Sequence, residues 1–94
     1  MKPNPITDFV VTNHAAMELK RRGLTKEIIR RVLADPEQGE DVRAGRIVLQ
    51  SRMDMGQPAK QYLVRVFIDM DRRPAEVVTA YRTSKVSKYW REEP

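Results

Sequence analysis

His14 is the single histidine of this 94-residue sequence, and it is the first candidate for proton-transfer chemistry. Imidazole exchanges protons near neutral pH, so a histidine can act as a general base there. On a helix, Glu18 and Arg21 would fall on the same side as His14, four and seven residues further on. These three residues could place a general base beside a cation that binds phosphate. An ordinary exposed polar helix face explains the same pattern equally well.

A second set of candidate residues lies near the C-terminus. Thr79 and Tyr81 would place two hydroxyls on one face of a strand, followed by Arg82 and Lys85. Arg65, in the preceding expected strand, adds another cation. Hydroxyls and cations can hold a phosphodiester without a metal ion. The alternative is a tyrosine and threonines that simply pack in a sheet, where both residue types are common.

The charge balance favours a polyanionic partner such as nucleic acid. Lys and Arg number 18 against 13 Asp and Glu, which gives a net charge of +5 and a sequence pI near 9.9. The cations concentrate in two blocks, within 20–31 and 72–91, and an acidic stretch over 35–41 separates them. If the fold joins the two blocks they form a phosphate-binding face; otherwise they are two separate solvated surfaces.

Several function classes are excluded by what the sequence lacks. With no cysteine there is no disulfide framework and no thiolate zinc site, and this composition fits a reducing compartment. The chain also has no glycine-rich phosphate loop, no nucleophile elbow and no His-Glu-x-x-His motif. We therefore predict no metal and no cofactor. Because no apolar signal or membrane-spanning stretch is present, we expect a cytoplasmic protein without a membrane partner.

Local signals predict two helices after a short edge strand or an extended lead-in over 6–11. Thr12 or Asn13 can cap a helix over 14–22 that ends at Gly23. Thr25 can cap a second helix that ends at Asp35-Pro36, because the residue before a proline is disfavoured in a helix. A length of 94 residues permits one domain, 1–94, with flexible ends at 1–5 and 91–94.

The rest of the chain is predicted to form strands over 46–53, 62–69 and 75–82. Turns over 54–59 and 71–74 separate them. Alternation places Val64 and Val66 on one face and Arg65 on the other, and it places Val77 on the same face as Thr79. Two helices followed by such a meander indicate an α+β fold, with both helices packed on a three- to four-stranded antiparallel sheet.

Two motifs together resemble a known bacterial family. The run His14-Ala15-Ala16-Met17-Glu18-Leu19-Lys20-Arg21-Arg22-Gly23-Leu24-Thr25 and the strand Val78-Thr79-Ala80-Tyr81 are similar to the domain of unknown function 4258, over about 12–90. That family looks like part of the barnase/EndoU/colicin/RelE group of small nucleases, many of which are metal-independent ribonuclease toxins. The resemblance implies a RelE-like fold with two helices on a four-stranded antiparallel sheet.

The resemblance also implies roles for individual residues. His14 takes the helix position of the site, Arg22 the basic position before the glycine, and Thr79 and Tyr81 the last-strand positions. The expected catalytic residues are therefore His14, Thr79 and Tyr81, and the expected phosphate-binding residues are Arg21, Arg22, Arg65, Arg82 and Lys85. Glu18 departs from the family, which often has an arginine there. It would either repel phosphate or orient His14.

The expected function is a metal-independent endoribonuclease that cleaves RNA, free or on the ribosome. It would be the toxin of a toxin–antitoxin pair, with an acidic antitoxin as its protein partner. The alternative is a non-catalytic module that keeps the fold and binds nucleic acid or protein, which Glu18 favours.

Overall fold

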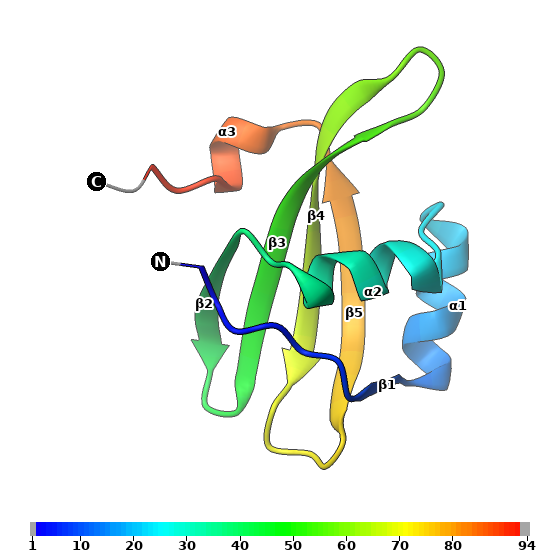
Figure 1. Ribbon diagram of the computed structural model, residues 1–94. Helices are drawn as coiled ribbons and strands as arrows, with labels where there is room; N and C mark the ends of the chain where they lie inside the picture. Colours follow the sequence, from blue (N-terminus) through cyan, green and yellow to red (C-terminus); the bar gives the residue numbers. More distant parts are fainter. Residues whose placement is uncertain (1, 93–94) are drawn as a thin grey trace.

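The computed structural model describes residues 2–92 and shows an α+β fold built on a five-stranded mixed sheet (Figure 1). The elements, in chain order, are β1 (Phe9–Val11), α1 (Asn13–Arg21), α2 (Lys26–Ala34), β2 (Gln38–Arg43), β3 (Arg46–Met55), β4 (Lys60–Asp69), β5 (Ala75–Thr83) and α3 (Val86–Tyr89). The predicted class is confirmed. The predicted three to four antiparallel strands and the two helices differ from the five mixed strands and three helices observed.

The first two helices begin and end where the sequence signals place them. The hydroxyls of Thr12 and Thr25 each accept the backbone N–H three residues later, at 3.1 and 3.2 Å. Gly23 has φ 72°, a left-handed conformation that residues with a Cβ rarely adopt, and it turns the chain after α1. Because these caps are local interactions, the predicted bounds lie within about a residue of the observed ones.

The sheet has the strand order β1-β5-β4-β3-β2, and β1 pairs with β5 in parallel. The prediction of an all-antiparallel sheet is therefore wrong at this edge. A short hairpin forces two strands to pair antiparallel. No hairpin joins β1 and β5, because most of the chain lies between them, so these two strands can pair in parallel. β1 covers the edge of β5 only over Ala75–Val77, and α1 continues along the rest of that edge.

Two elements were not predicted. β2 has a sequence poor in strand formers, Gln-Gly-Glu-Asp-Val-Arg, which indicated an acidic loop. It pairs antiparallel with β3 at the outer edge of the sheet, where charged side chains reach water. α3 spans four residues, too few for a helical periodicity to be visible in the sequence.

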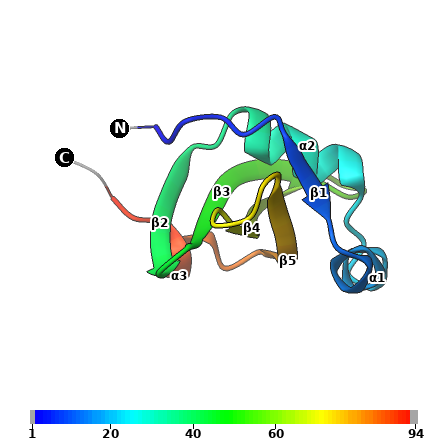
Figure 2. The same cartoon turned by 90° about the horizontal axis from the view of Figure 1, so that it is seen from below.

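The two faces of the sheet carry different layers. Figure 2 shows α2 on one face and α3 on the other, with α1 beside the edge of β5. Val64, Val66 and Ile68 face α2 in the hydrophobic core, as predicted. An irregularity in the β4–β5 pairing sets Val77 opposite Ile68 but Thr79 opposite Phe67. Val77 and Thr79 therefore lie on opposite faces, and their predicted shared face is wrong, because a bulge shifts the alternation by one residue.

Part of each predicted flexible end can be placed. Residues 1, 93 and 94 lie outside the described residues. Lys2 forms an ion pair with Asp35. The Arg91 guanidinium donates to the Gly39 carbonyl oxygen at 2.6 Å, so Arg91 is held against β2. Within residues 2–92, no helix has the length and apolar character needed to cross a membrane.

Candidate active site

Four polar side chains meet where α1 runs along the edge of β5; we call His14, Glu18, Arg22 and Thr79 the α1–β5 cluster. His14 and Glu18 of α1 and its C-cap residue Arg22 are spaced by four, so one helix face presents all three to the strand. The Thr79 hydroxyl donates to Glu18 Oε1 at 2.8 Å, and His14 Nε2 lies 3.5 Å from Glu18 Oε2. One carboxylate therefore joins the helix histidine to the strand threonine.

Arg22 closes the cluster on the strand side. Its Nη1 donates to Thr79 Oγ1 at 3.2 Å and to the Ala80 carbonyl oxygen at 2.8 Å, which satisfies a backbone acceptor at the edge of β5. Its Nη2 lies 3.7 Å from Glu18 Oε2. The Thr79 hydrogen bond, followed by the positive charges of Arg22, His14 and Arg21, lowers the pKa of Glu18. Glu18 is therefore ionised at neutral pH.

The exposure of the cluster rises toward His14. The Glu18 side chain is 20% exposed, that of Arg22 is 42% and that of His14 is 77%. A carboxylate beside Nε2 favours the tautomer that carries its proton on Nε2, which leaves Nδ1 as the acceptor. The open imidazole can thus take a proton from a large substrate while Glu18 stabilises the charge that develops.

Tyr81 and Arg65 belong to a different group, the Arg65 cluster, beneath α3 on the opposite face of the sheet from α2. Arg65 is 8% exposed, and its Nε and Nη1 donate to Gln50 Oε1 at 2.9 Å and to the Tyr81 hydroxyl at 2.7 Å. Its Nη2 reaches Glu40 at 3.4 Å, and its guanidinium lies 4.5 Å from the centre of the Tyr89 ring. Three of its five N–H groups already have protein acceptors, and the side chain is buried, so Arg65 is poorly placed to bind a phosphate.

The remaining expected phosphate contacts are exposed. The Arg82 guanidinium lies 4.9 Å from the centre of the Tyr62 ring and packs against Gly23, at the C-terminal end of α1. Arg21 and Lys85 are also exposed. Within residues 2–92 none of these three cations forms an ion pair. They remain available to an anion, unlike Arg65.

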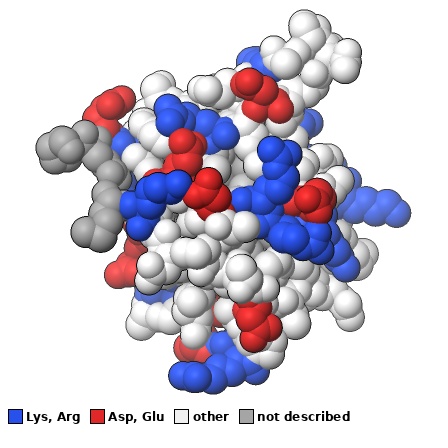
Figure 3. Space-filling model, viewed as in Figure 1, with Lys and Arg blue, Asp and Glu red and all other residues white. Residues whose placement is uncertain are grey.

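The two cationic blocks do not merge into one positive surface on the face that α2 covers. Figure 3 shows Lys and Arg side chains there interspersed with Asp and Glu. On α2 itself, Arg30 pairs with Glu27 at 2.5 Å. Besides Arg22 itself, the cations beside the α1–β5 cluster are Arg21 on α1 and Arg82 near Gly23.

Sequence reasoning singled out His14, Thr79 and Arg22, and the structure brings these three together. It left open whether Glu18 orients His14, and the observed geometry favours that role. It missed Gln50, which is 3% exposed and bonds Arg65, because an amide within a strand carries no distinctive sequence signal. Residues 2–92 contain no group of three or more His, Cys, Asp or Glu side chains that could hold a metal ion.

Comparison with protein-family models, with curated proteins and with solved structures gave no match for this chain. Function is therefore inferred from the chemistry of the site.

Proposed function

We propose that the protein is a metal-independent endoribonuclease whose general base is His14. The observation that carries this proposal is the placement of the Glu18 carboxylate between the imidazole and the Thr79 hydroxyl, at a solvent-exposed edge of the sheet. A base beside a carboxylate, a hydroxyl and an arginine is a set of groups suited to acid–base chemistry on a phosphodiester.

In the proposed reaction the base activates a hydroxyl of the substrate itself. His14 takes the proton of a ribose 2′-OH, and the 2′-oxygen attacks the adjacent phosphorus. The bond from phosphorus to the 5′-oxygen breaks, and that oxygen takes a proton from solvent. The products are a 2′,3′-cyclic phosphate and a 5′-hydroxyl end, so RNA is a substrate and DNA is not.

Charge on the phosphate oxygens increases along this path, and nearby cations would stabilise it. Arg22 is the cation in direct contact with Thr79, and the exposed Arg21, Arg82 and Lys85 would bind flanking phosphates. We assign Arg65 and Tyr81 to stabilisation of the fold, because they are bonded to each other. As a toxin, the protein would need a partner that masks this edge, and an acidic antitoxin acting in the cytoplasm would do so.

A second candidate function is RNA binding without cleavage, and one observation favours it. Arg22 Nη1 and the Thr79 hydroxyl already have partners within the protein, and Glu18 adds negative charge where a phosphate would approach. If substrate cannot displace these contacts, the cations around the end of α1 would still bind RNA. That binding would weaken steeply as salt rises.

The deciding experiment is cleavage of an RNA oligonucleotide in EDTA, compared with the same oligonucleotide carrying 2′-deoxyriboses throughout. We expect the ribose strand alone to be cleaved and to yield cyclic phosphate ends. His14→Ala should lower the rate by about 100-fold or more, whereas Met17→Ala, on the same exposed helix surface, should cleave normally. Salt-sensitive binding without any cleavage would reject the nuclease in favour of the binding module.

A further inference from the structure

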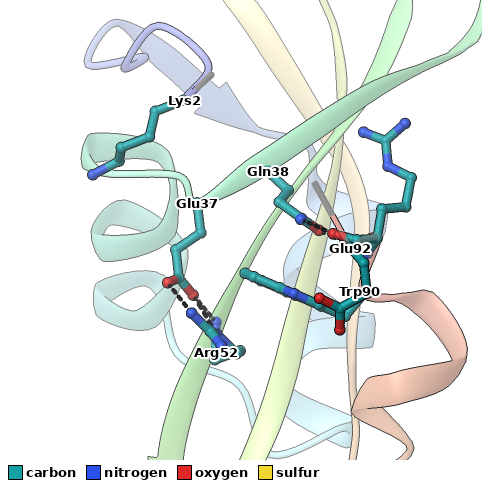
Figure 4. A pocket seen from close by; sticks show the side chains of 7 residues that line it. Lys2, Glu37, Gln38, Arg52, Trp90 and Glu92 are labelled. Carbon is teal, nitrogen blue, oxygen red and sulfur yellow. Dashed lines mark hydrogen bonds and ion pairs between the residues drawn. The ribbon is translucent and has the colours of Figure 1, made fainter. Parts of the chain in front are cut away.

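A cavity of about 340 Å³ lies at the opposite edge of the sheet from the α1–β5 cluster, between the start of β2, β3 and the segment that follows α3. Figure 4 shows that side chains from segments far apart in the sequence converge on it. Its charged and aromatic lining residues are Lys2, Glu37, Arg52, Trp90, Arg91 and Glu92. The volume is near the lower end for small-molecule sites and suits a ligand of nucleotide size.

One wall of the cavity contains a stacked pair, in which the Arg52 guanidinium covers one face of the Trp90 ring. The Arg52 guanidinium lies 3.9 Å from the centre of the Trp90 ring. Glu37 fixes that guanidinium, accepting from Nη2 at 2.9 Å and from Nε at 3.2 Å, and the contact lowers the pKa of Glu37. Aromatic rings and guanidinium planes are the groups on which proteins stack nucleobases. The Arg52 side chain is 40% exposed and lines the cavity, so the outer face of its guanidinium is the surface on which a base would stack.

The segment that carries Trp90 is held in place by a buried amide. The Gln38 side chain is 3% exposed, and its Nε2 donates to the Arg91 carbonyl oxygen at 2.5 Å. Its Oε1 accepts the Arg91 backbone N–H at 3.2 Å. A four-residue helix such as α3 gives the next residue little support, so these two hydrogen bonds are what hold Trp90 in position.

The cavity also holds a carboxylate with unused acceptors. Both oxygens of Glu37 are bonded to Arg52, whereas Glu92 has no ion-pair or hydrogen-bond partner within residues 2–92. A carboxylate accepts two neighbouring N–H groups. Guanine presents such a pair, N1–H beside N2–H₂, whereas adenine and cytosine place an acceptor beside their amino group and uracil has a single N–H donor. A ligand with the guanine edge matches Glu92 best.

We propose that this cavity binds a guanine nucleotide. The base stacks on the outer face of the Arg52–Trp90 pair, and its N–H edge donates to Glu92. The phosphate binds Lys2 and Arg91 at the rim by competing with Asp35 and Glu40, which pair with these two cations in the free protein. The guanine can belong to a free nucleotide or to an RNA strand. The proposal does not depend on cleavage at His14, because the two sites share no residue.

Trp90 is the single tryptophan of the chain, so its fluorescence reports directly on this cavity. We would titrate the full chain with GMP, AMP, CMP and UMP, and with short RNAs that contain or lack one guanine. We expect a saturable change with guanine ligands, at least about tenfold tighter than with adenine ligands. Glu92→Gln should remove that preference, because an amide accepts at one atom only. Glu27→Gln, the same change at an exposed site on α2, should keep it.

The outcomes separate the two sources and the two sites. Tight binding of GMP itself identifies a nucleotide site, and guanine dependence confined to the oligonucleotides identifies an RNA subsite. Equal affinity for all four bases, no binding in either arm, or an unchanged preference in Glu92→Gln would overturn the proposal. His14→Ala should leave the fluorescence response intact, so failure of the nuclease assay and failure of this assay are distinguishable.

Discussion

The α1–β5 cluster and the Arg65 cluster use similar side chains in opposite ways. Each joins an arginine, a hydroxyl and a carboxylate, and each lies on β5 or against it. In the Arg65 cluster the arginine is 8% exposed and each of its nitrogens has a protein acceptor. In the α1–β5 cluster the histidine is 77% exposed and Glu18 engages one nitrogen of its ring. The first arrangement stabilises a fold, and the second leaves a reactive group open to a substrate.

This difference teaches that residue type and strand position do not by themselves assign a role. Tyr81 and Thr79 are two residues apart on one face of β5, and from sequence they looked like one site. What separates them is the neighbour each one bonds: Arg65 for Tyr81, and Glu18 with Arg22 for Thr79. The partner of Tyr81 is buried, whereas the partners of Thr79 are partly exposed, and on this difference we propose a chemical role for Thr79 alone.

The largest expected change in stability follows removal of the buried arginine. Arg65→Ala leaves Gln50, 3% exposed, without the donor to its Oε1 and removes the cation beneath the Tyr89 ring. An unsatisfied buried polar group and a cavity together cost about 3 kcal/mol. Urea unfolding followed by circular dichroism measures this loss. A loss below about 1 kcal/mol would mean that the cluster does not stabilise the fold.

A smaller change is expected at the α1–β5 cluster. Thr79→Val keeps the shape of the side chain but removes the hydroxyl between Glu18 and Arg22, at a cost of about 1 kcal/mol. RNA cleavage should also slow, since Glu18 loses the group that positions it. Thr7→Val, an exposed threonine with no side-chain hydrogen bond in residues 2–92, is the matched control and should change neither quantity. Equal unfolding free energies and equal rates for the two variants would contradict the assigned role of Thr79.

The contribution of Glu18 should depend on pH in a defined direction. Its pKa in the folded state is lowered from 4.5, mainly by Thr79, so ionised Glu18 stabilises the fold above about pH 4.5. That contribution is lost as the pH falls below this value and the carboxylate is protonated. Wild type should therefore exceed Glu18→Gln in melting temperature near pH 7, and the difference should shrink toward about pH 3. A difference that grows as the pH falls would contradict the assignment.

The smallest effect is expected on the outer surface of α2. Arg30 pairs with Glu27 where both side chains are about two-thirds exposed, and such pairs contribute little. Arg30→Ala should change the free energy of unfolding by less than about 0.5 kcal/mol, measured by the same urea unfolding. Destabilisation comparable to that of Arg65→Ala would show that burial is not what distinguishes the two arginines.

The sequence predicted the elements whose signals are local. Thr12, Thr25 and Gly23 define the ends of the first two helices through contacts within a few residues, and the three strands of the meander alternate visibly. β2 and the parallel pairing of β1 depend on partners distant in the chain, so no local pattern indicates them. Val77 and Thr79 lie on opposite faces because of a bulge in the β4–β5 pairing, and the alternation of residue types within β5 cannot reveal that bulge.

The candidate site was predictable in part for the same reason. His14 and Glu18 share a helix face through their spacing, as predicted. The arginine that contacts Glu18 and Thr79 is Arg22, whereas the spacing predicts Arg21 on that face. The division between Thr79 and Tyr81 was not predictable, because it follows from which strand neighbour reaches each hydroxyl.

The most direct test of the division between the two clusters measures cleavage and stability on the same two variants. His14→Ala should lose RNA cleavage by about 100-fold or more in EDTA while its unfolding free energy stays within about 0.5 kcal/mol of wild type. Tyr81→Phe should lose about 1 kcal/mol or more, because Arg65 loses an acceptor, and should cleave at a rate near that of wild type. Normal cleavage by His14→Ala, or loss of cleavage in a fully stable Tyr81→Phe, would contradict the account.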